Sequence, residues 1–253
     1  MALLEVSDPT VRFGRVVALD RVSFVVNAGE VAALIGPNGA GKTTLFNVIA
    51  RVYRPAGGKV MFDGEPVLKL SGHQVVRRGL ARTFQNLALF RSMTVLENVL
   101  VGDHINIGSS FVGASTPLPG ALRAEAGARK RAMEMLDFVG LSRQAGLPVA
   151  ALPFGIQKRV EMARALVSKP RLVMLDEPAG GISHEEVADM ARLVRRIHSD
   201  LGVTVLLVEH NMAFVMGISD RVVVLDFGRK IAEGSPAEVQ GNPAVIEAYL
   251  GAA

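Results

Sequence analysis

Cysteine and tryptophan are absent from this 253-residue sequence, and tyrosine occurs only twice. Without cysteine there can be no disulfide, no thiolate metal site and no cysteine nucleophile. No apolar run reaches the length of about 18 residues that a membrane-spanning helix needs. The first residues, Met1–Glu5, lack the basic stretch and long apolar stretch of a secretory signal peptide. We therefore expect a reduced, cytosolic protein.

The charge of the chain is also small, because 28 Lys and Arg side chains against 24 Asp and Glu leave a net charge of +4. The paired arginines at residues 77–78 and 195–196 fit solvated helix faces better than a track for phosphates. We therefore expect no nucleic-acid partner. Apolar residues make up 49% of the chain, which excludes a disordered protein, and the length suits one large domain.

Short runs rich in valine and isoleucine alternate with helical patterns along the chain. This alternation predicts an α/β fold with a mostly parallel sheet. Residues 86–168 are nearly all helix and loop, so we expect a helical subdomain inserted into a core of residues 1–85 and 169–253; within it, 102–120 has loop composition. The expected strands are Val22–Val26, Val31–Ile35, Val60–Phe62, Leu80–Phe84, Leu172–Leu175, Val203–Val208 and Val222–Asp226, and the expected helices are Lys42–Arg51, Thr94–Val101, Ala121–Val139, Gln157–Ser168, His184–His198, Met212–Ser219 and Pro243–Leu250.

The strongest motif is the segment Gly36–Thr43, which fits the pattern G-x-x-x-x-G-K-[ST] of a phosphate-binding loop. It follows an expected buried strand and opens an expected helix. Glycines let consecutive backbone amides point inward, and the helix N-terminus adds a partial positive charge. Lys42 would reach the β- and γ-phosphates of a nucleotide, and the Thr43 hydroxyl would bind Mg²⁺.

Two carboxylates, Asp176 and Glu177, follow the apolar run Leu172–Leu175. Ligand sites in open parallel sheets form at the carboxyl ends of the strands. Asp176 is therefore expected to hold the Mg²⁺ ion, and Glu177 to polarise the water that attacks the γ-phosphate. Taken alone, the pair would fit a solvated acidic turn equally well.

In this order the motifs resemble those of ATP-binding subunits of ABC transporters, nearly from end to end. The resemblance implies that Phe13 stacks on adenine, that Gln85 touches Mg²⁺, and that His210 contacts the γ-phosphate. Each of these residues taken alone has an ordinary structural explanation. The ATP-binding residues implied are Phe13, Val16, Gly36, Pro37, Asn38, Gly39, Ala40, Gly41, Lys42, Thr43 and Thr44.

The segment Leu152–Gln157 resembles the signature motif of the same family, and residues 178–183 occupy the position of its D-loop. Pro153 stands in place of the usual serine and Phe154 in place of a glycine, so anion contacts must come from Gly155, neighbouring amides and the helix N-terminus. Ser183 replaces the D-loop aspartate. The residues expected to bind ATP held by a second subunit are Pro153, Phe154, Gly155, Ile156 and Gln157.

Two longer segments, residues 80–98 and 234–251, resemble branched-chain amino acid transport ATP-binding proteins of the LivG type. Urea and amide importers share similar segments. The resemblance implies a P-loop NTPase core with an N-terminal antiparallel β subdomain, and hydrolysis of ATP by two such subunits, as a homodimer or a related heterodimer. It also implies two transmembrane permease subunits, a periplasmic or extracellular solute-binding protein, and a peripheral location on the cytoplasmic face of the bacterial plasma membrane.

Three questions stay open at this point. The side chains of Leu87, Leu89 and Phe90 could contact a permease or be buried within their own subdomain. An ABC ATPase acting on DNA or ribosomes is a further alternative, although the chain has one nucleotide module and no heptad run. A GTPase would need an Asn-Lys-x-Asp motif, which is absent, and a small-molecule kinase would not need the second anion site near Gly155.

Overall fold

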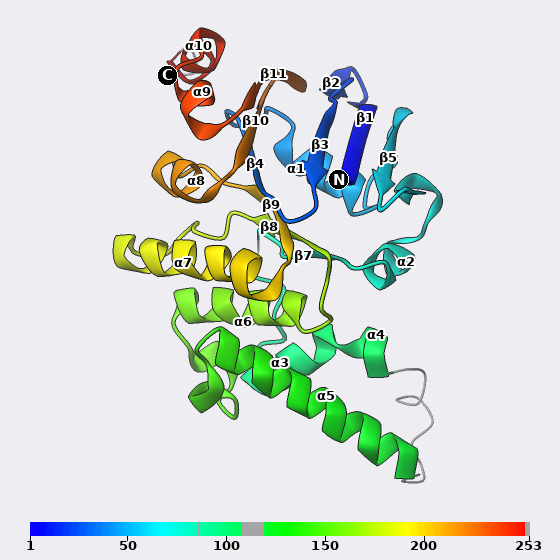
Figure 1. Cartoon of the computed structure of the whole chain (residues 1–253), viewed down its shortest axis with the longest axis vertical. Coiled ribbons are helices and arrows are strands. Elements are labelled where there is room, and N and C mark those ends of the chain that lie inside the picture. The colour runs from blue at the N-terminus through cyan, green and yellow to red at the C-terminus, as the bar shows by residue number, and fades with distance from the viewer. Residues whose placement is uncertain (86, 108–118, 251–253) are drawn as a thin grey trace. The chain divides into compact units, whose positions relative to one another are not determined.

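The computed structural model describes residues 1–85, 87–107 and 119–250 (Figure 1). The chain divides into two compact units. The core unit comprises Met1–Arg82, Arg171–Gly180 and His184–Ala253; the helical unit comprises Thr83–Pro170 and Gly181–Ser183. The boundaries expected from the sequence were residues 86 and 168, so the helical unit is slightly longer and includes a short segment near Gly181.

The larger sheet of the core unit has six strands. They are β4 (Val31–Ile35), β7 (Leu80–Arg82), β8 (Leu172–Asp176), β9 (Thr204–Val208), β10 (Arg221–Asp226) and β11 (Arg229–Gly234). Their order is β11-β10-β4-β9-β8-β7, and every neighbouring pair except β10-β11 is parallel. All residues of β4, β8 and β9 are buried, as expected for strands covered on both faces. The predicted mostly parallel sheet is confirmed.

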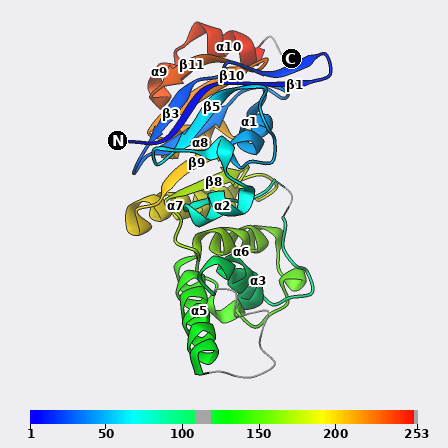
Figure 2. The same ribbon diagram turned by 90° about the vertical axis from the view of Figure 1, so that its right-hand side faces the viewer.

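The second sheet of the core unit is antiparallel. Its strands are β1 (Ala2–Phe13), β2 (Val16–Asp20), β3 (Phe24–Asn27), β5 (Gly57–Phe62) and β6 (Glu65–Pro66). Figure 2 shows β3 and β5 beside β1, which pairs with both. The residue patterns predicted neither β1 nor β2 as strands. Asp8 has a left-handed φ of 53° and Pro9 cannot donate a hydrogen bond, so the alternation of apolar residues in β1 is interrupted.

Six α-helices of the described chain belong to the core unit. They are α1 (Lys42–Ile49), α2 (Gly72–Arg77), α7 (His184–Leu201), α8 (Met212–Ile218), α9 (Pro236–Gln240) and α10 (Pro243–Leu250). Helix α7 buries Met190, Leu193, Val194 and Ile197, a spacing that places them on one face. Short helices α2 and α9 were not predicted, although Ser235 begins α9 with a capping box to Glu238.

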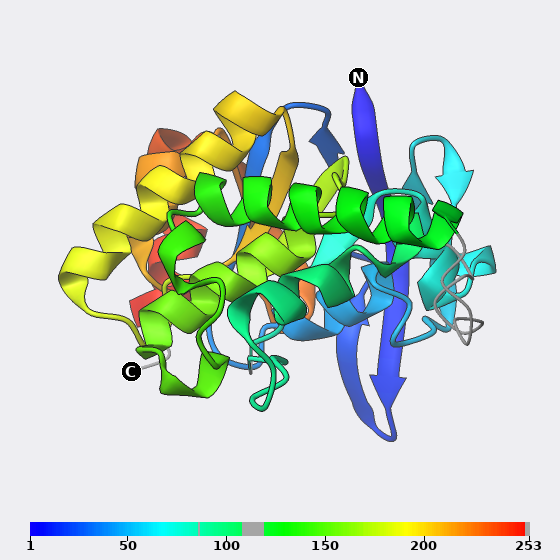
Figure 3. The same ribbon diagram turned by 90° about the horizontal axis from the view of Figure 1, so that it is seen from below.

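The helical unit contains α3 (Val95–Gly102), α4 (His104–Ile107), α5 (Pro119–Phe138) and α6 (Phe154–Leu166). Thr94 and Glu97 form a capping box at the start of α3. Helix α3 packs against both α5 and α6, and Figure 3 shows the green helices of this unit from below. The loop expected over residues 102–120 is wrong at both ends, because α4 lies at one end and α5 begins at the other. The middle of this expected loop, residues 108–118, lies outside the described residues. Within the described ranges, no helix combines the length and the apolar character needed to cross a membrane.

Among the predicted element ends that differ from the structure, two bear on the site. The strand expected over Leu80–Phe84 ends at Arg82, because the N–H of Phe84 donates to the side chain of Glu161 (3.2 Å) instead of to a neighbouring strand. The helix expected from Gln157 begins at Phe154, with Pro153 at its N-cap (φ −55°). The fixed φ of proline suits the chain just ahead of a helix.

Candidate nucleotide-binding site

Three segments with chemically active side chains meet at one edge of the six-stranded sheet. The phosphate loop follows β4, Glu177 follows β8, and His210 comes soon after β9. These strands are neighbours and parallel, and Val208 of β9 is in register with Asp176 on one side and Leu34 on the other. The carboxyl edge of the sheet therefore gathers the residues that the sequence predicted for nucleotide chemistry.

The phosphate loop depends on glycine at two positions. Gly36 has φ 150°, and a Cβ there would lie 2.1 Å from the carbonyl oxygen of Leu225; Gly41, the N-cap of α1, has φ 99°, and its Cβ would lie 2.5 Å from the carbonyl oxygen of Ala18. No other residue fits these positions without moving the backbone. The loop therefore curls directly into the N-terminus of α1, where backbone amides and the helix dipole favour an anion.

Lys42 folds back over this loop. Its Nζ donates to the carbonyl oxygens of Gly36 (2.6 Å) and Pro37 (2.8 Å), and the residue is only 6% exposed. Burial lowers the pKa of the Lys42 ammonium, and the nearby carboxylates of Glu177 and Asp176 offset part of this shift. A buried ammonium next to a curled loop is suited to a phosphate group, which would supply further negative charge.

Asp176, at the end of β8, is 3% exposed and accepts a 2.8 Å hydrogen bond at Oδ2 from Arg82. Arg82 also donates to Asn47 (2.7 Å) and lies 5.5 Å from the centre of the Phe46 ring. The guanidinium thus connects the carboxylate to α1, the helix that starts at the phosphate loop. Arg82 was not among the predicted site residues, although it is the last residue of β7.

Glu177 occupies an uncommon backbone conformation, with φ 50°. Its N–H donates to the carbonyl of Val208 (2.9 Å), and its Oε1 lies 3.0 Å from Nε2 of His210. A non-glycine residue in this region costs about 1 kcal/mol or more and persists where the surrounding structure fixes it. The structure therefore brings together the two side chains that the sequence predicted as the base and the γ-phosphate contact.

A second carboxylate that the sequence analysis missed lies behind this pair. Glu209 is 2% exposed, and its carboxylate accepts from the backbone N–H groups of Ala179 (2.5 Å), His210 (2.9 Å) and Asn211 (3.3 Å). One side chain therefore holds the segments that follow β8 and β9. This arrangement fixes the separation of Glu177 and His210. In the sequence, Glu209 could have been identified as an acidic residue directly after an apolar strand.

For the ATP hydrolysis that the resemblance to ABC transporter subunits implies, we expect Glu209→Gln to lower the rate about tenfold and to leave ATP affinity unchanged, because the amide directs an NH₂ group at a backbone donor. Steady-state hydrolysis and calorimetric titration with ATP measure the two quantities. Glu5→Gln, at an exposed position of β1, is the matched control. An unchanged rate would show that Glu209 does not act on hydrolysis through the positions of Glu177 and His210.

The predicted adenine platform lies at the end of β1. Phe13 is 49% exposed, and its ring centre lies 5.4 Å from that of Tyr53 in an edge-to-face arrangement. Val16, which begins β2, is 66% exposed. Both side chains offer apolar surface to solvent, and this is the property that stacking on a nucleobase requires.

Gln85 and the signature residues belong to the helical unit. Pro153 caps α6, Gly155 is buried, and the side chain of Gln157 donates to the carbonyl of Leu152 (2.8 Å). The ring of Phe154 packs against Gly181, where an added Cβ would lie 3.0 Å from Cε1. Phe154, which stands at the glycine position of the predicted signature, therefore contacts the predicted D-loop segment within the same unit.

A magnesium ion would find a suitable but incomplete set of protein ligands. The Thr43 hydroxyl and the Asp176 carboxylate are hard oxygen donors. No cluster of three or more His, Cys, Asp and Glu side chains suited to a metal ion occurs in the part of the chain that the structure describes. An ion held mainly by phosphate oxygens and water, as Mg²⁺ commonly is in nucleotide sites, fits this donor set.

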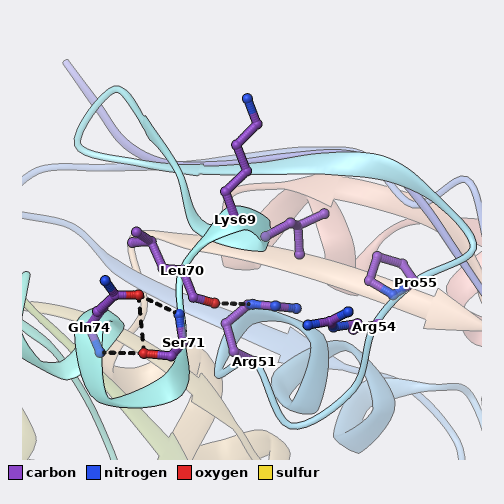
Figure 4. Close-up of a pocket in the computed structure, with 8 residues that line it drawn as sticks. Arg51, Arg54, Pro55, Lys69, Leu70, Ser71 and Gln74 are labelled. Atoms are coloured by element: carbon purple, nitrogen blue, oxygen red, sulfur yellow. Dashed lines mark hydrogen bonds between the residues drawn. The ribbon is translucent and has the colours of Figure 1, made fainter.

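A basic depression elsewhere in the core unit has a volume of about 640 Å³ (Figure 4). Arg51 donates from Nε to the carbonyl of Leu70 (2.8 Å), and Arg54 lies beside it. Both follow the C-terminal end of α1, where cations complement the helix dipole. The depression contains none of the predicted site residues. Its lining is Arg51, Arg54, Pro55, Leu68, Lys69, Leu70, Ser71 and Gln74.

Comparison with known families shows which family of proteins has this arrangement of residues at the edge of the sheet. The profile of the ABC transporter family matches residues 19–180, a range that contains the phosphate loop, Gln85, the signature and Asp176. The chain belongs to the ABC transporter family. It is an ATP-hydrolysing ABC ATPase with the α/β P-loop fold, so these predictions from the sequence are confirmed. A second profile, of branched-chain amino acid ATP-binding cassette transporters, matches residues 229–253.

Individual members of the family resemble this ABC ATPase along its whole length. It is 43% identical to the high-affinity branched-chain amino acid transport ATP-binding protein BraF of Pseudomonas aeruginosa, and 40% identical to LivG of Escherichia coli, over 99% of this chain and 98% of each relative. The crystal structure of the ADP conformation of MJ1267, an ATP-binding cassette of an ABC transporter, matches with a TM-score of 0.85 at 31% identity over 99% of both chains. A dimeric structure of MJ0796, a bacterial ABC transporter cassette, matches with a TM-score of 0.76 at 26% identity, over 92% of this chain and 98% of the other.

Proposed function

We propose that this ABC ATPase powers the import of branched-chain amino acids. The observation that carries the ATPase part is the meeting of Lys42, Glu177 and His210 at the carboxyl edge of the parallel sheet. The substrate part rests on the full-length similarity to BraF and LivG and on the family profile matched by residues 229–253. Import of urea, amides or other polar solutes is the second candidate, favoured by the segments that such importers share.

In the proposed mechanism, the amides of residues 39–43 and the Lys42 ammonium bind the β- and γ-phosphates of ATP. Phe13 and Val16 hold the adenine ring. Thr43 and Asp176 would hold Mg²⁺ in the core unit, with Gln85 as a further ligand, and the ion would neutralise phosphate charge. Glu177 orients and polarises the attacking water, and His210, 3.0 Å from Glu177, contacts the γ-phosphate.

The proposed working unit contains two ATPase subunits. The N-terminus of α6, with Gly155 and its neighbours, offers a second set of amides suited to an anion, and it is far along the chain from Lys42. We propose that residues Pro153–Gln157 of each subunit bind the ATP held by the other, as the dimeric state of the related cassette MJ0796 suggests. ATP binding would close the pair and hydrolysis would reopen it.

The remaining partners would be two transmembrane permeases and an extracytoplasmic solute-binding protein, with the ATPase on the cytoplasmic face of the bacterial plasma membrane. Reconstitution of the ATPase with its permeases in liposomes tests this proposal. Leucine, isoleucine and valine with the binding protein should stimulate hydrolysis. Stimulation by urea or amides and not by these amino acids would identify the second candidate instead.

Phe90 is the most exposed of the three side chains considered for the permease contact. It is 48% exposed, whereas Leu87 and Leu89 are half-buried. Its backbone is fixed, because the buried amide of Asn98 accepts from its N–H (2.8 Å) and donates to its carbonyl (3.1 Å). An exposed ring on a fixed backbone suits an apolar contact with a partner helix.

We therefore expect Phe90→Asp to leave ATP binding and basal hydrolysis intact but to abolish solute-stimulated transport in liposomes. Phe227→Asp changes an 85% exposed ring of the core unit and serves as a matched control that should keep transport. Wild-type transport by the Phe90 variant would exclude this contact.

A further inference from the structure

A buried carboxylate of α6 binds the backbone on both sides of Gln85. Glu161 is 4% exposed, and its Oε1 accepts a hydrogen bond from the N–H of Phe84 (3.2 Å). The same carboxylate also accepts from the N–H of Ala88. Two backbone donors that bracket the predicted Mg²⁺ ligand are therefore held by one side chain of the signature helix.

Arg164, one turn further along α6, completes this arrangement. Its Nη1 donates to the carbonyl of Ala88, and its Nη2 lies 3.7 Å from Oε1 of Glu161. The N–H and the carbonyl of Ala88 are thus both bound by α6. The helix itself has little freedom at this point, because a Cβ on Gly102 of α3 would lie 2.0 Å from the carbonyl oxygen of Arg164.

The cost of burying these charges argues that the arrangement has a role beyond filling space. Burial raises the pKa of the Glu161 carboxyl, against the opposing effect of the Phe84 N–H and of the charges of Arg164 and Lys158. Burial likewise lowers the pKa of Arg164. An apolar side chain would fill the same space without desolvating a charge, but it could not bind the backbone around Gln85.

The same face of α6 leads to the signature motif. Phe154, Lys158, Glu161 and Arg164 follow one another at intervals of four, three and three residues, which places them in one row along the helix. The Nζ of Lys158 lies 5.5 Å from the centre of the Phe154 ring. The row therefore runs from the first residue of the helix, within the signature, to the segment that carries Gln85.

We infer that Glu161 is a positioning residue for Gln85, and that with Arg164 it makes the Gln85 segment move together with the signature helix. The inference rests on the proposed role of Gln85 in hydrolysis. The inferred connection lies inside the helical unit: when the signature of a subunit binds ATP, the signature helix would set the position of Gln85 in the same subunit. The connection needs the Glu161 carboxylate, because this group accepts both hydrogen bonds from the backbone amides.

The test is a double-mutant cycle of Glu161→Gln and Gln85→Ala, with Glu134→Gln as an exposed glutamate control in the same unit. The amide of Glu161→Gln keeps the size of the side chain but directs a donor at a backbone N–H, so we expect hydrolysis to fall about tenfold. Hydrogen exchange at the amides of Phe84 and Ala88 should become faster, and ATP affinity should stay unchanged. Because Glu161 acts through Gln85, the double variant should be no slower than Gln85→Ala.

Three results would overturn the inference. Losses that multiply in the double variant would mean that Glu161 acts independently of Gln85, and an unchanged rate in Glu161→Gln would remove its role, with the proposed ATPase mechanism intact in both cases. A wild-type rate in Gln85→Ala would contradict the proposed role of Gln85 itself. Arg164→Lys keeps the charge but loses the forked donor, so it should lower the hydrolysis rate less than Glu161→Gln does. If Glu161→Gln unfolds, the same double-mutant cycle with Arg164→Lys and Gln85→Ala tests the inference.

Discussion

Lys42→Ala is expected to weaken ATP binding about a hundredfold. The ammonium is buried and already donates to two carbonyls of the loop at 2.6 and 2.8 Å, so it is positioned before the nucleotide arrives. Charge-assisted hydrogen bonds contribute about 1.5–3 kcal/mol each. At the lower end of this range, the loss of two such bonds to phosphate oxygens corresponds to roughly two orders of magnitude in Kd. Titration calorimetry with ATP and magnesium measures the effect.

Two controls accompany this variant. Lys130→Ala removes a 79% exposed lysine of α5 and should leave Kd unchanged. Thermal unfolding without nucleotide shows whether the loop tolerates the loss of the Lys42 contacts to Gly36 and Pro37. If a folded Lys42→Ala variant binds ATP with wild-type affinity, the assignment of this loop to the phosphates is wrong.

Glu177→Gln is expected to slow hydrolysis by about a hundredfold or more, the usual effect of losing a positioned general base. ATP binding should persist, because Lys42 and the loop amides are unchanged. The amide can still contact His210 across the 3.0 Å separation, so the backbone of the site should hold its shape. The variant should therefore accumulate with bound ATP.

The accumulated state gives a second readout. If two subunits close around ATP, sedimentation of Glu177→Gln should show a dimer with ATP and magnesium and a smaller species with ADP. Glu185→Gln, an exposed acidic residue of α7, should behave like the wild type in both assays. Rapid hydrolysis by Glu177→Gln would remove this residue from the role of base.

Much of the core unit could be predicted because its signals are local. The five residues of β4 are all buried and apolar, and the glycine-rich loop that follows has a fixed spacing set by phosphate geometry. Helix α7 carries a regular apolar face, and its predicted start at His184 is the observed one. Such elements depend on residues close together in the chain, so the sequence reveals them directly.

The features that escaped prediction depend on contacts between distant segments. Strand β11 lies at the edge of its sheet, and three of its six residues are charged. Only its pairing with β10 makes it a strand. Glu209 and Glu161 look like ordinary acidic residues until the fold places backbone amides against their carboxylates. Arg82 likewise binds a partner, Asp176, that lies far along the chain. No periodicity or motif encodes these partners.

A crystal structure of Glu177→Gln with ATP and magnesium would show where the nucleotide binds. We expect the triphosphate on the amides of residues 39–43, the γ-phosphate at Lys42, and the metal at Thr43 and Asp176. A triphosphate bound elsewhere, with Lys42 still turned onto Gly36 and Pro37, would contradict this expectation.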